Sequence, residues 1–234
     1  MKIEGLGNVG YYLSDYLNHL NKQNNEFCPT QIPKKHQANP SYSIEFLSDH
    51  TGYYKINADN FDRISSLNHI LDYQKNHQCL EGLEEDKSYN ITKITKTEFL
   101  QGYCHIFVPA ALELTIQAPE AKLLNCNLIV EGSNGPVSDE AEKILMKRNI
   151  PIIPDILCNS GGVIVSYFEW IQNISNELWT EEKVLTKLDG KMLECFDKIR
   201  TTEGHDIYQW RKQCYQYAIE NIFDVYSSRK SYLF

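Results

Sequence analysis

Residues 5–10 read Gly5-Leu6-Gly7-Asn8-Val9-Gly10, and this stretch decides the fold. A very short apolar strand, residues 1–4, precedes it, and apolar side chains at helical spacing follow over residues 9–20. The pattern GxGxxG between a strand and a helix is typical of domains that bind a dinucleotide. In such domains the free N–H groups at the start of the helix face the pyrophosphate. Taken alone, the pattern also fits a glycine-rich turn without a ligand.

Each glycine of this turn has its own physical role. Gly5 allows the tight turn, Gly7 lets the backbone approach a pyrophosphate, and Gly10 lets the helix pack on the strand. An acidic residue that accepts the ribose hydroxyls is expected at the end of the next strand, where Asp49 stands. Asp49 lies farther along than the usual distance of about 20 residues. A proline-bearing polar insertion at about 21–40 explains the excess; an ordinary turn aspartate is the alternative.

Short apolar runs alternate with helical patterns beyond the insertion. Strands are expected over residues 42–48, 105–109, 127–131 and 150–155, and helices over residues 61–77 and 139–148. Ser138 is the expected N-cap of the second helix. Residues 79–96 are polar and give no clear pattern. The alternation indicates an α/β fold of the Rossmann type, with a doubly wound, mostly parallel sheet and helices on both faces.

The last third of the chain is helical in pattern. Apolar positions within residues 184–199 and 210–226 mark two amphipathic helices, and no strand signal appears there. We therefore predict a dinucleotide-binding domain over residues 1–178, with C-terminal helices over 179–234 that pack on the same domain.

Composition and charge exclude several classes of partner. The formal net charge of −8 gives no general field that would attract nucleic acid or an anionic membrane. No apolar run approaches the ~20 residues that span a bilayer, and the first residues do not resemble a signal peptide. Seven scattered cysteines without a CxxC pair indicate reduced thiols, as in the cytoplasm or the mitochondrial matrix. No pattern indicates a metal site.

Several stretches together resemble the glutamate dehydrogenases of the Glu/Leu/Phe/Val dehydrogenase superfamily. Residues 5–10 are similar to the family's GFGNVG, 48–52 to SDSxG, 106–113 to DxxxPAALE and 130–136 to xEGANGP. The longest match, residues 153–170, is similar to VPDILANAGGVTVSYFEW. It implies a helix after Gly161-Gly162, whereas the apolar pattern of residues 163–168 alone predicts a strand. PAALE, EGxNGP and SYFEW favour the glutamate branch.

The resemblance implies a role for each matched position. On the cofactor side, Gly7, Asn8 and Val9 would contact the pyrophosphate, and Asp49 would contact the adenosine ribose. Ala110 and Ala111 would line the dinucleotide cleft. Asn134 and Asn159 would orient the nicotinamide ribose and carboxamide. Val163 and Ser166 would face the substrate, and the Ser166 hydroxyl would donate a hydrogen bond to the distal carboxylate. Plainer readings of the residues stay open: Asn134-Gly135 is a common turn dipeptide, and Ser166 fits a serine whose hydroxyl bonds within its own helix.

The activity implied by the resemblance is NAD(P)-dependent oxidative deamination of L-glutamate to 2-oxoglutarate and ammonia. Asp49 would repel a 2′-phosphate, which favours NAD; NADP is the alternative, because His50 and Lys55 lie near it. Full-length family members form homo-oligomers, usually hexamers. The family's catalytic lysines and aspartate lie in an N-terminal substrate domain with a GGxKGG stretch, which these residues do not contain, so no catalytic residue is assigned. The alternative function is a catalytically inactive cofactor-binding or regulatory module.

Overall fold

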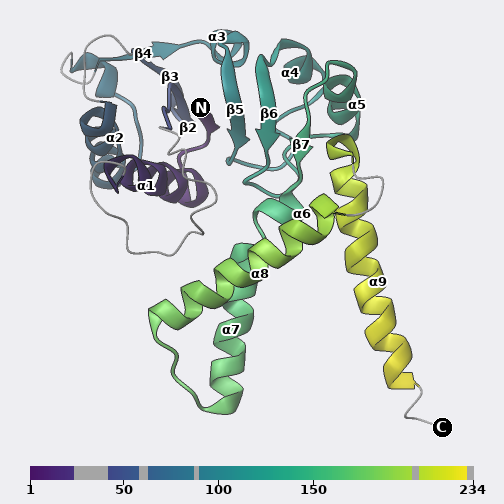
Figure 1. Cartoon of the computed structure of the whole chain (residues 1–234). Helices are drawn as coiled ribbons and strands as arrows, with labels where there is room; N and C mark the ends of the chain where they lie inside the picture. Colours follow the sequence, from purple (N-terminus) through teal and green to yellow (C-terminus); the bar gives the residue numbers. More distant parts are fainter. Residues whose placement is uncertain (24–41, 58–62, 87–89, 202–205, 231–234) are drawn as a thin grey trace. The chain divides into compact units, whose positions relative to one another are not determined.

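The computed structural model describes residues 1–23, 42–57, 63–86, 90–201 and 206–230 (Figure 1). The described chain forms two compact units, residues 1–150 (unit 1) and residues 151–234 (unit 2). Most of the expected polar insertion lies outside the described residues; its first three residues continue a helix. A cofactor-binding domain that extends to residue 178 stays a prediction.

A seven-stranded sheet has the strand order β4-β3-β2-β1-β5-β6-β7. Its strands are β1 (Lys2–Glu4), β2 (Phe46–Asp49), β3 (Gly52–Ile56), β4 (Ile91–Ile94), β5 (Cys104–Pro109), β6 (Cys126–Val130) and β7 (Ile152–Ile153). β1 pairs in parallel with β2 and β5, and β5 pairs in parallel with β6. β3 runs antiparallel to β2 and β4. The expected α/β fold with a mostly parallel sheet is confirmed.

The antiparallel edge was not expected from the sequence. The turn between β2 and β3 consists of His50 and Thr51, so β3 folds directly back along β2. The stretch that gave no clear pattern contains a short 3-10 helix, η2 (Leu83–Glu85), and β4, which pairs with β3. Short strands with few apolar residues leave too weak an alternation to be recognised.

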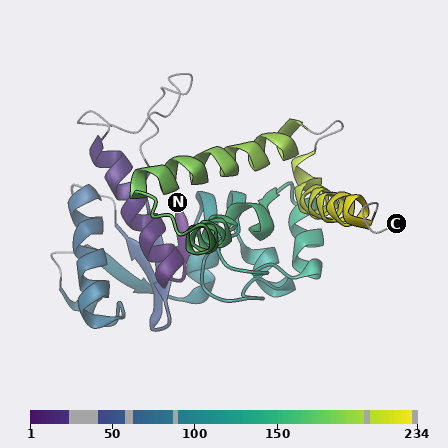
Figure 2. The same cartoon turned by 90° about the horizontal axis from the view of Figure 1, so that it is seen from below.

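The helices of unit 1 are α1 (Asn8–Gln23), α2 (Arg63–His77), α3 (Lys96–Gln101), α4 (Ala118–Leu123) and α5 (Asp139–Lys147). α1 and α2 pack side by side (Figures 1 and 2). Ser138 is the N-cap of α5, as expected: its hydroxyl oxygen accepts a hydrogen bond from the Ala141 N–H at 3.2 Å. A side chain that satisfies a free N–H in this way fixes where the helix begins.

Unit 2 is mainly helical. It contains α6 (Asp155–Cys158), α7 (Gly161–Ser175), α8 (Glu181–Thr201), a 3-10 helix η4 (Ile207–Gln209) and α9 (Trp210–Lys230). The strand that the apolar pattern predicts over residues 163–168 is wrong, and the helix implied by the family resemblance is confirmed. A small core of Leu157, Ile199, Trp210 and Cys214 joins α6, α8 and α9.

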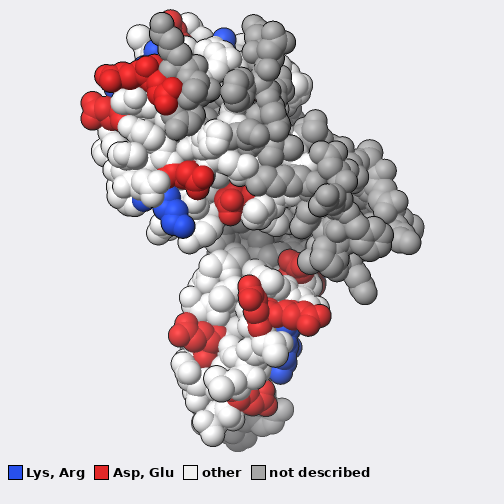
Figure 3. Space-filling model, turned by 90° about the vertical axis from the view of Figure 1, so that its left-hand side faces the viewer, with Lys and Arg blue, Asp and Glu red and all other residues white. Residues whose placement is uncertain are grey.

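The surface reflects the acidic composition. On the face shown in Figure 3, acidic side chains form several groups and basic side chains are few. Within the part of the chain that the structure describes, no helix is both long and apolar enough to cross a membrane.

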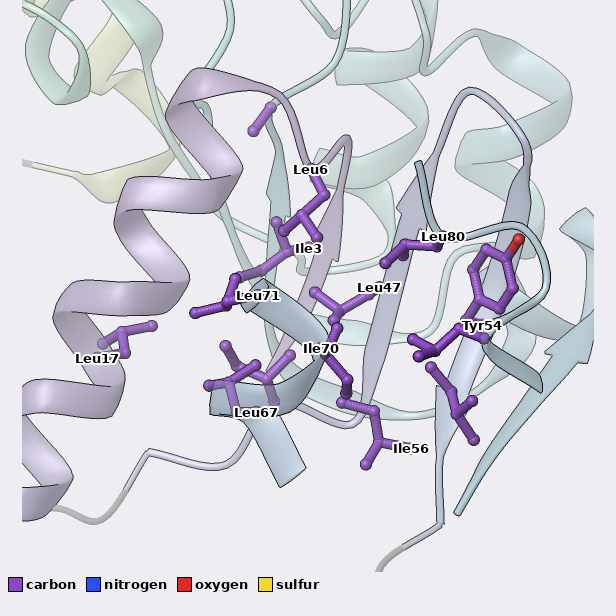
Figure 4. Packing of buried hydrophobic residues seen from close by; sticks show 14 of the residues in the cluster. Ile3, Leu6, Leu17, Leu47, Tyr54, Ile56, Leu67, Ile70, Leu71 and Leu80 are labelled. Atoms are coloured by element: carbon purple, nitrogen blue, oxygen red, sulfur yellow. The ribbon is translucent and has the colours of Figure 1, made fainter. Parts of the chain in front are cut away.

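The main core lies between the sheet and the pair α1 and α2 (Figure 4). Ile3 and Leu47 from the strands meet Leu67, Ile70 and Leu71 from α2, and all five side chains are buried. Successive side chains of a strand point to opposite faces of the sheet. Because Ile3 faces this core, Lys2 and Glu4 face the other side, where α3 packs.

Candidate functional site

The glycine-rich turn begins where β1 ends. The backbone of Gly5 has φ +91°, a left-handed conformation that glycine adopts at little cost, and a Cβ there would lie 2.6 Å from the Cα of Ala111. At Gly10, a Cβ would lie 2.0 Å from the carbonyl oxygen of Gly5. Side chains at these two positions would collide with backbone, so the turn requires both glycines.

Backbone hydrogen bonds connect this turn to the neighbouring strands. The Gly5 N–H donates to both the carbonyl and the hydroxyl oxygen of Ser48, each at 3.1 Å. On the other side, the Ala110 N–H donates to the Glu4 carbonyl at 2.7 Å. The carboxyl ends of β2, β1 and β5 are thus held together, where open α/β sheets bind their ligands.

The loop after β6 joins the same edge. The N–H groups of Gly132 and Ser133 both donate to the Pro109 carbonyl at 3.0 Å. A Cβ at Gly132 would lie 3.2 Å from the Val9 side chain and 3.3 Å from that of Ala110. Three sequence motifs, from β1, β5 and β6, therefore meet at one edge of the sheet. Asn134 is exposed two residues beyond Gly132.

The outer side of the turn is open. A Cβ at Gly7 would meet no atom of the described chain within 4 Å beyond its neighbours, and Asn8 and Val9 are exposed. The first N–H groups of a helix have no partner within the helix, and its dipole makes this end positive. No acidic residue stands in the first turn of α1. The open backbone and the positive helix end therefore fit a pyrophosphate group.

Asp49 ends β2 and is half-buried. Its Oδ1 accepts hydrogen bonds from the Thr51 N–H at 2.8 Å, the Thr51 hydroxyl at 2.6 Å and the Gly52 N–H at 3.2 Å. Its Oδ2 accepts one from the Leu80 N–H at 2.6 Å. The carboxylate thus stabilises the turn between β2 and β3. A carboxylate has about four acceptor positions, and contact with a ribose stays a prediction.

The other predicted residues lie in unit 2. Asn159 is half-buried at the C-cap of α6, where its N–H donates to the Asp155 carbonyl at 2.9 Å. Val163 has 68% of its surface exposed in the first turn of α7. The Ser166 hydroxyl donates to the Gly162 carbonyl at 3.1 Å, within its own helix. The hydroxyl oxygen keeps acceptor capacity, and contact with substrate stays a prediction for both residues.

Two charged residues of β1 were missed by sequence reasoning. Lys2 is fully buried, and its Nζ donates to the carbonyls of Leu100 and Gly102 at 3.2 and 2.7 Å. The Nζ also lies 5.0 Å from the ring centre of Phe46 and 5.2 Å from that of Phe99. Burial lowers the pKa of Lys2, because the charged form loses its hydration. Lys2 therefore joins β1 to the C-terminal end of α3.

Glu4 ends β1 directly before Gly5 and is 4% exposed. Burial raises the pKa of the Glu4 carboxyl, and the neighbouring Thr115 hydroxyl and Lys96 partly oppose that rise. The only available sequence signal was the spacing of two charges, at positions 2 and 4, inside an apolar strand.

The sequence profile described as Glutamate/Leucine/Phenylalanine/Valine dehydrogenase matches residues 38–229. The chain belongs to this dehydrogenase family. It is 31% identical over 220 residues to the NAD-specific glutamate dehydrogenase of Peptoniphilus asaccharolyticus. The matched region covers 94% of this chain and 46% of that enzyme. It is 38% identical over 129 residues to glutamate dehydrogenase B of Halobacterium salinarum. That matched region covers 55% of this chain and 30% of that enzyme. Matches to these dehydrogenases span less than half of their length.

Solved structures show the same fold. The crystal structure of the P. asaccharolyticus glutamate dehydrogenase matches with a TM-score of 0.66 and 26% identity, over 97% of this chain and 46% of that chain. Glutamate dehydrogenase 2 of Plasmodium falciparum matches with a TM-score of 0.60 and 25% identity, over 93% of this chain and 46% of that one. The chain thus belongs to a family of oxidoreductases. The matched region spans less than half the length of each of those two enzyme chains.

Proposed function

We propose that this chain supplies the cofactor-binding domain of an NAD(P)-dependent glutamate dehydrogenase. The reaction is the oxidative deamination of L-glutamate to 2-oxoglutarate and ammonia. The observation that carries the proposal is the meeting of the Gly5–Gly10 turn, Ala110 and Gly132 at one edge of the sheet. Two relatives, from P. asaccharolyticus and H. salinarum, support it through their names.

The dinucleotide would be held by residues of unit 1. Gly7, Asn8 and Val9 would offer backbone N–H groups to the pyrophosphate, and Ala110 and Ala111 would form a wall of small side chains beside it. Asn134 would orient the nicotinamide ribose. When bound, the nicotinamide supplies an acceptor for the hydride that leaves the amino-acid α-carbon.

The substrate contacts would come from unit 2. Asn159 would hold the nicotinamide carboxamide, Val163 would face the aliphatic part of glutamate, and Ser166 would contact its distal carboxylate. A polar contact that the bound substrate shields from water would discriminate strongly against analogues that lack the group. This proposal therefore makes Ser166 the residue that favours glutamate over apolar amino acids.

NAD is the proposed cofactor. Asp49 places a negative charge at the end of β2, which would repel the 2′-phosphate of NADP. The P. asaccharolyticus relative is named NAD-specific. His50 and Lys55, both exposed, are the groups that would admit NADP instead.

We also propose that the whole protein is a homo-oligomer, most simply a hexamer. A glutamate dehydrogenase of Thermus thermophilus is described as hetero-hexameric, and it shares the fold with a TM-score of 0.66 at 18% identity.

The six described cysteines are free thiols, which suits a reducing compartment.

Calorimetric titration of the 234-residue polypeptide with NAD and with NADP tests this function. We expect NAD to bind and NADP to bind more weakly. We expect no glutamate-dependent reduction of NAD, because hydride transfer needs a closed cleft and a base that these residues do not supply. Failure of both dinucleotides to bind would refute the cofactor role. Measurable turnover would refute the claim that these residues bind the cofactor without supplying the catalytic base and the closed cleft.

A further inference from the structure

Ser160 lies in the junction between α6 and α7, directly after Asn159, and is half-buried. Its hydroxyl lies 3.0 Å from the carbonyl oxygen of Leu157 in α6 and 3.3 Å from the sulfur of Met192 in α8. A thioether sulfur is a weak acceptor, so the hydroxyl donates its proton to the Leu157 carbonyl. Met192 adds a packing contact on the same hydroxyl.

This hydrogen bond spans Asn159. It joins position 160 to position 157, so Asn159 lies inside the short loop of backbone that the bond closes. The Asn159 N–H donates to the Asp155 carbonyl at 2.9 Å. Serine hydroxyls that bond to a carbonyl three or four residues earlier influence the local course of the backbone. The backbone at Asn159 is therefore held by two hydrogen bonds, one from its own N–H and one that passes across it.

Two further contacts anchor α6 within unit 2. The Oδ1 of Asp155 lies 3.3 Å from the Nη1 of Arg211 in α9. The Cys158 thiol donates to the Ile153 carbonyl of β7 at 3.4 Å. A side chain that starts from an anchored backbone loses less freedom when a ligand binds to it. The contacts around this junction therefore lower the cost of placing the Asn159 side chain against a ligand.

We propose that Ser160 is a positioning residue for the nicotinamide end of the cofactor: its hydroxyl orients the backbone that carries Asn159, and Asn159 holds the carboxamide. The inference rests on the proposed function, because that function places the carboxamide at Asn159. The family sequence VPDILANAGGVTVSYFEW has alanine at the position of Ser160, so this hydrogen bond is a feature of this chain and not of that pattern. Ser160 contacts neither cofactor nor substrate, and its effect passes through Asn159 alone.

Calorimetric titration with NAD and with ADP-ribose, which has no nicotinamide, tests this role. We expect Ser160→Ala to bind NAD about three- to tenfold more weakly than the wild type, because binding must then order a less constrained Asn159. We expect its affinity for ADP-ribose to change by less than about twofold, because that ligand has no carboxamide for Asn159 to hold. Ser175→Ala is the matched control: the Ser175 hydroxyl donates to the Ile171 carbonyl at 2.8 Å near the other end of α7, so both affinities keep their wild-type values.

A double-mutant cycle separates positioning from a general structural effect. In an Asn159→Ala background, which already binds NAD more weakly, Ser160→Ala should cause no further loss of NAD affinity. A further loss in that background, or equal weakening of NAD and ADP-ribose binding, overturns the positioning role. A Ser160→Ala variant with wild-type affinity for NAD overturns it as well, and each of these results leaves the proposed function intact.

Failure of the proposed function gives different results. A wild type that binds neither ligand refutes the cofactor role, and Asn159→Ala with wild-type NAD affinity refutes the role of Asn159. Either result also overturns the inference. Circular dichroism checks that each variant folds. Ser160→Cys, whose thiol is a weaker donor, replaces Ser160→Ala if that variant does not fold, and it should show the same selective loss of NAD affinity.

Discussion

At the scale of single residues, Gly10 is the position where the fold tolerates a side chain least. We expect Gly10→Ala to destabilise the protein by about 1–3 kcal/mol or more, because the Cβ would overlap the Gly5 carbonyl. Gly190→Ala is the matched control: a Cβ there, inside α8, meets no described atom, and alanine favours helix. Urea unfolding of both variants is the measurement. Equal stability of Gly10→Ala and the wild type would contradict this account of the turn.

Glu4 gives a second residue-scale prediction, on pH dependence. Its pKa is raised in the folded chain by burial, so the folded state holds the proton in a pH range above 4.5 where the unfolded state has lost it. The contribution of Glu4 to stability therefore falls as pH rises through that range. We expect Glu4→Gln to become more stable relative to the wild type as the pH rises above 4.5, as measured by unfolding at each pH. A difference that stays constant with pH would count against a raised pKa.

The sequence shows some of these residues and hides others for a physical reason. The tight turn at Gly5 and the close packing at Gly10 follow from a pattern that local backbone geometry imposes. In the structure Gly5 has a left-handed φ, and a Cβ at either glycine would collide with backbone. The burial of Lys2 and Glu4 depends on which face of β1 meets α3, and that is decided by tertiary packing. Charged residues in a short strand of a parallel sheet are uncommon, so neither was expected to be buried.

At the scale of elements, the beginning of α5 is set by one side chain. We expect Ser138→Ala to lower the unfolding free energy by about 1 kcal/mol, since the Ala141 N–H loses its acceptor. Thr97→Ala, at an exposed position of α3, is the control and should change stability by less than about 0.5 kcal/mol. Thermal unfolding distinguishes the two. A Ser138→Ala variant as stable as the control would show that the cap contributes nothing.

Elements with a strong period or a cap could be predicted, and elements fixed by pairing could not. α1, α2, α5 and α8 each follow an apolar stripe or a cap in the sequence. β4 has the pattern Ile-Thr-Lys-Ile and is a strand because it pairs with β3. α7 is apolar over most of its length, so its period is hidden, and only the family resemblance indicated a helix.

At the scale of the whole molecule, unit 2 exposes apolar side chains. In α9, Ile222 is 71% exposed and Phe223 is 65% exposed, and α7 buries none of its residues within the described chain. Exposed apolar patches of this kind promote association. We expect the 234-residue polypeptide to associate as its concentration rises, and Ile222→Asp with Phe223→Asp to weaken this association in sedimentation experiments. Identical sedimentation of the variant and the wild type would show that α9 is not involved.

The central claim concerns the open backbone in front of α1. The most direct measurement is the affinity for NADH, followed by its fluorescence, of the wild type and of Gly7→Val. The account predicts that the wild type binds NADH and that Gly7→Val, whose side chain enters open space, still folds but binds at least about tenfold more weakly. Unchanged NADH affinity in a folded Gly7→Val variant would contradict the claim that a pyrophosphate lies against this turn.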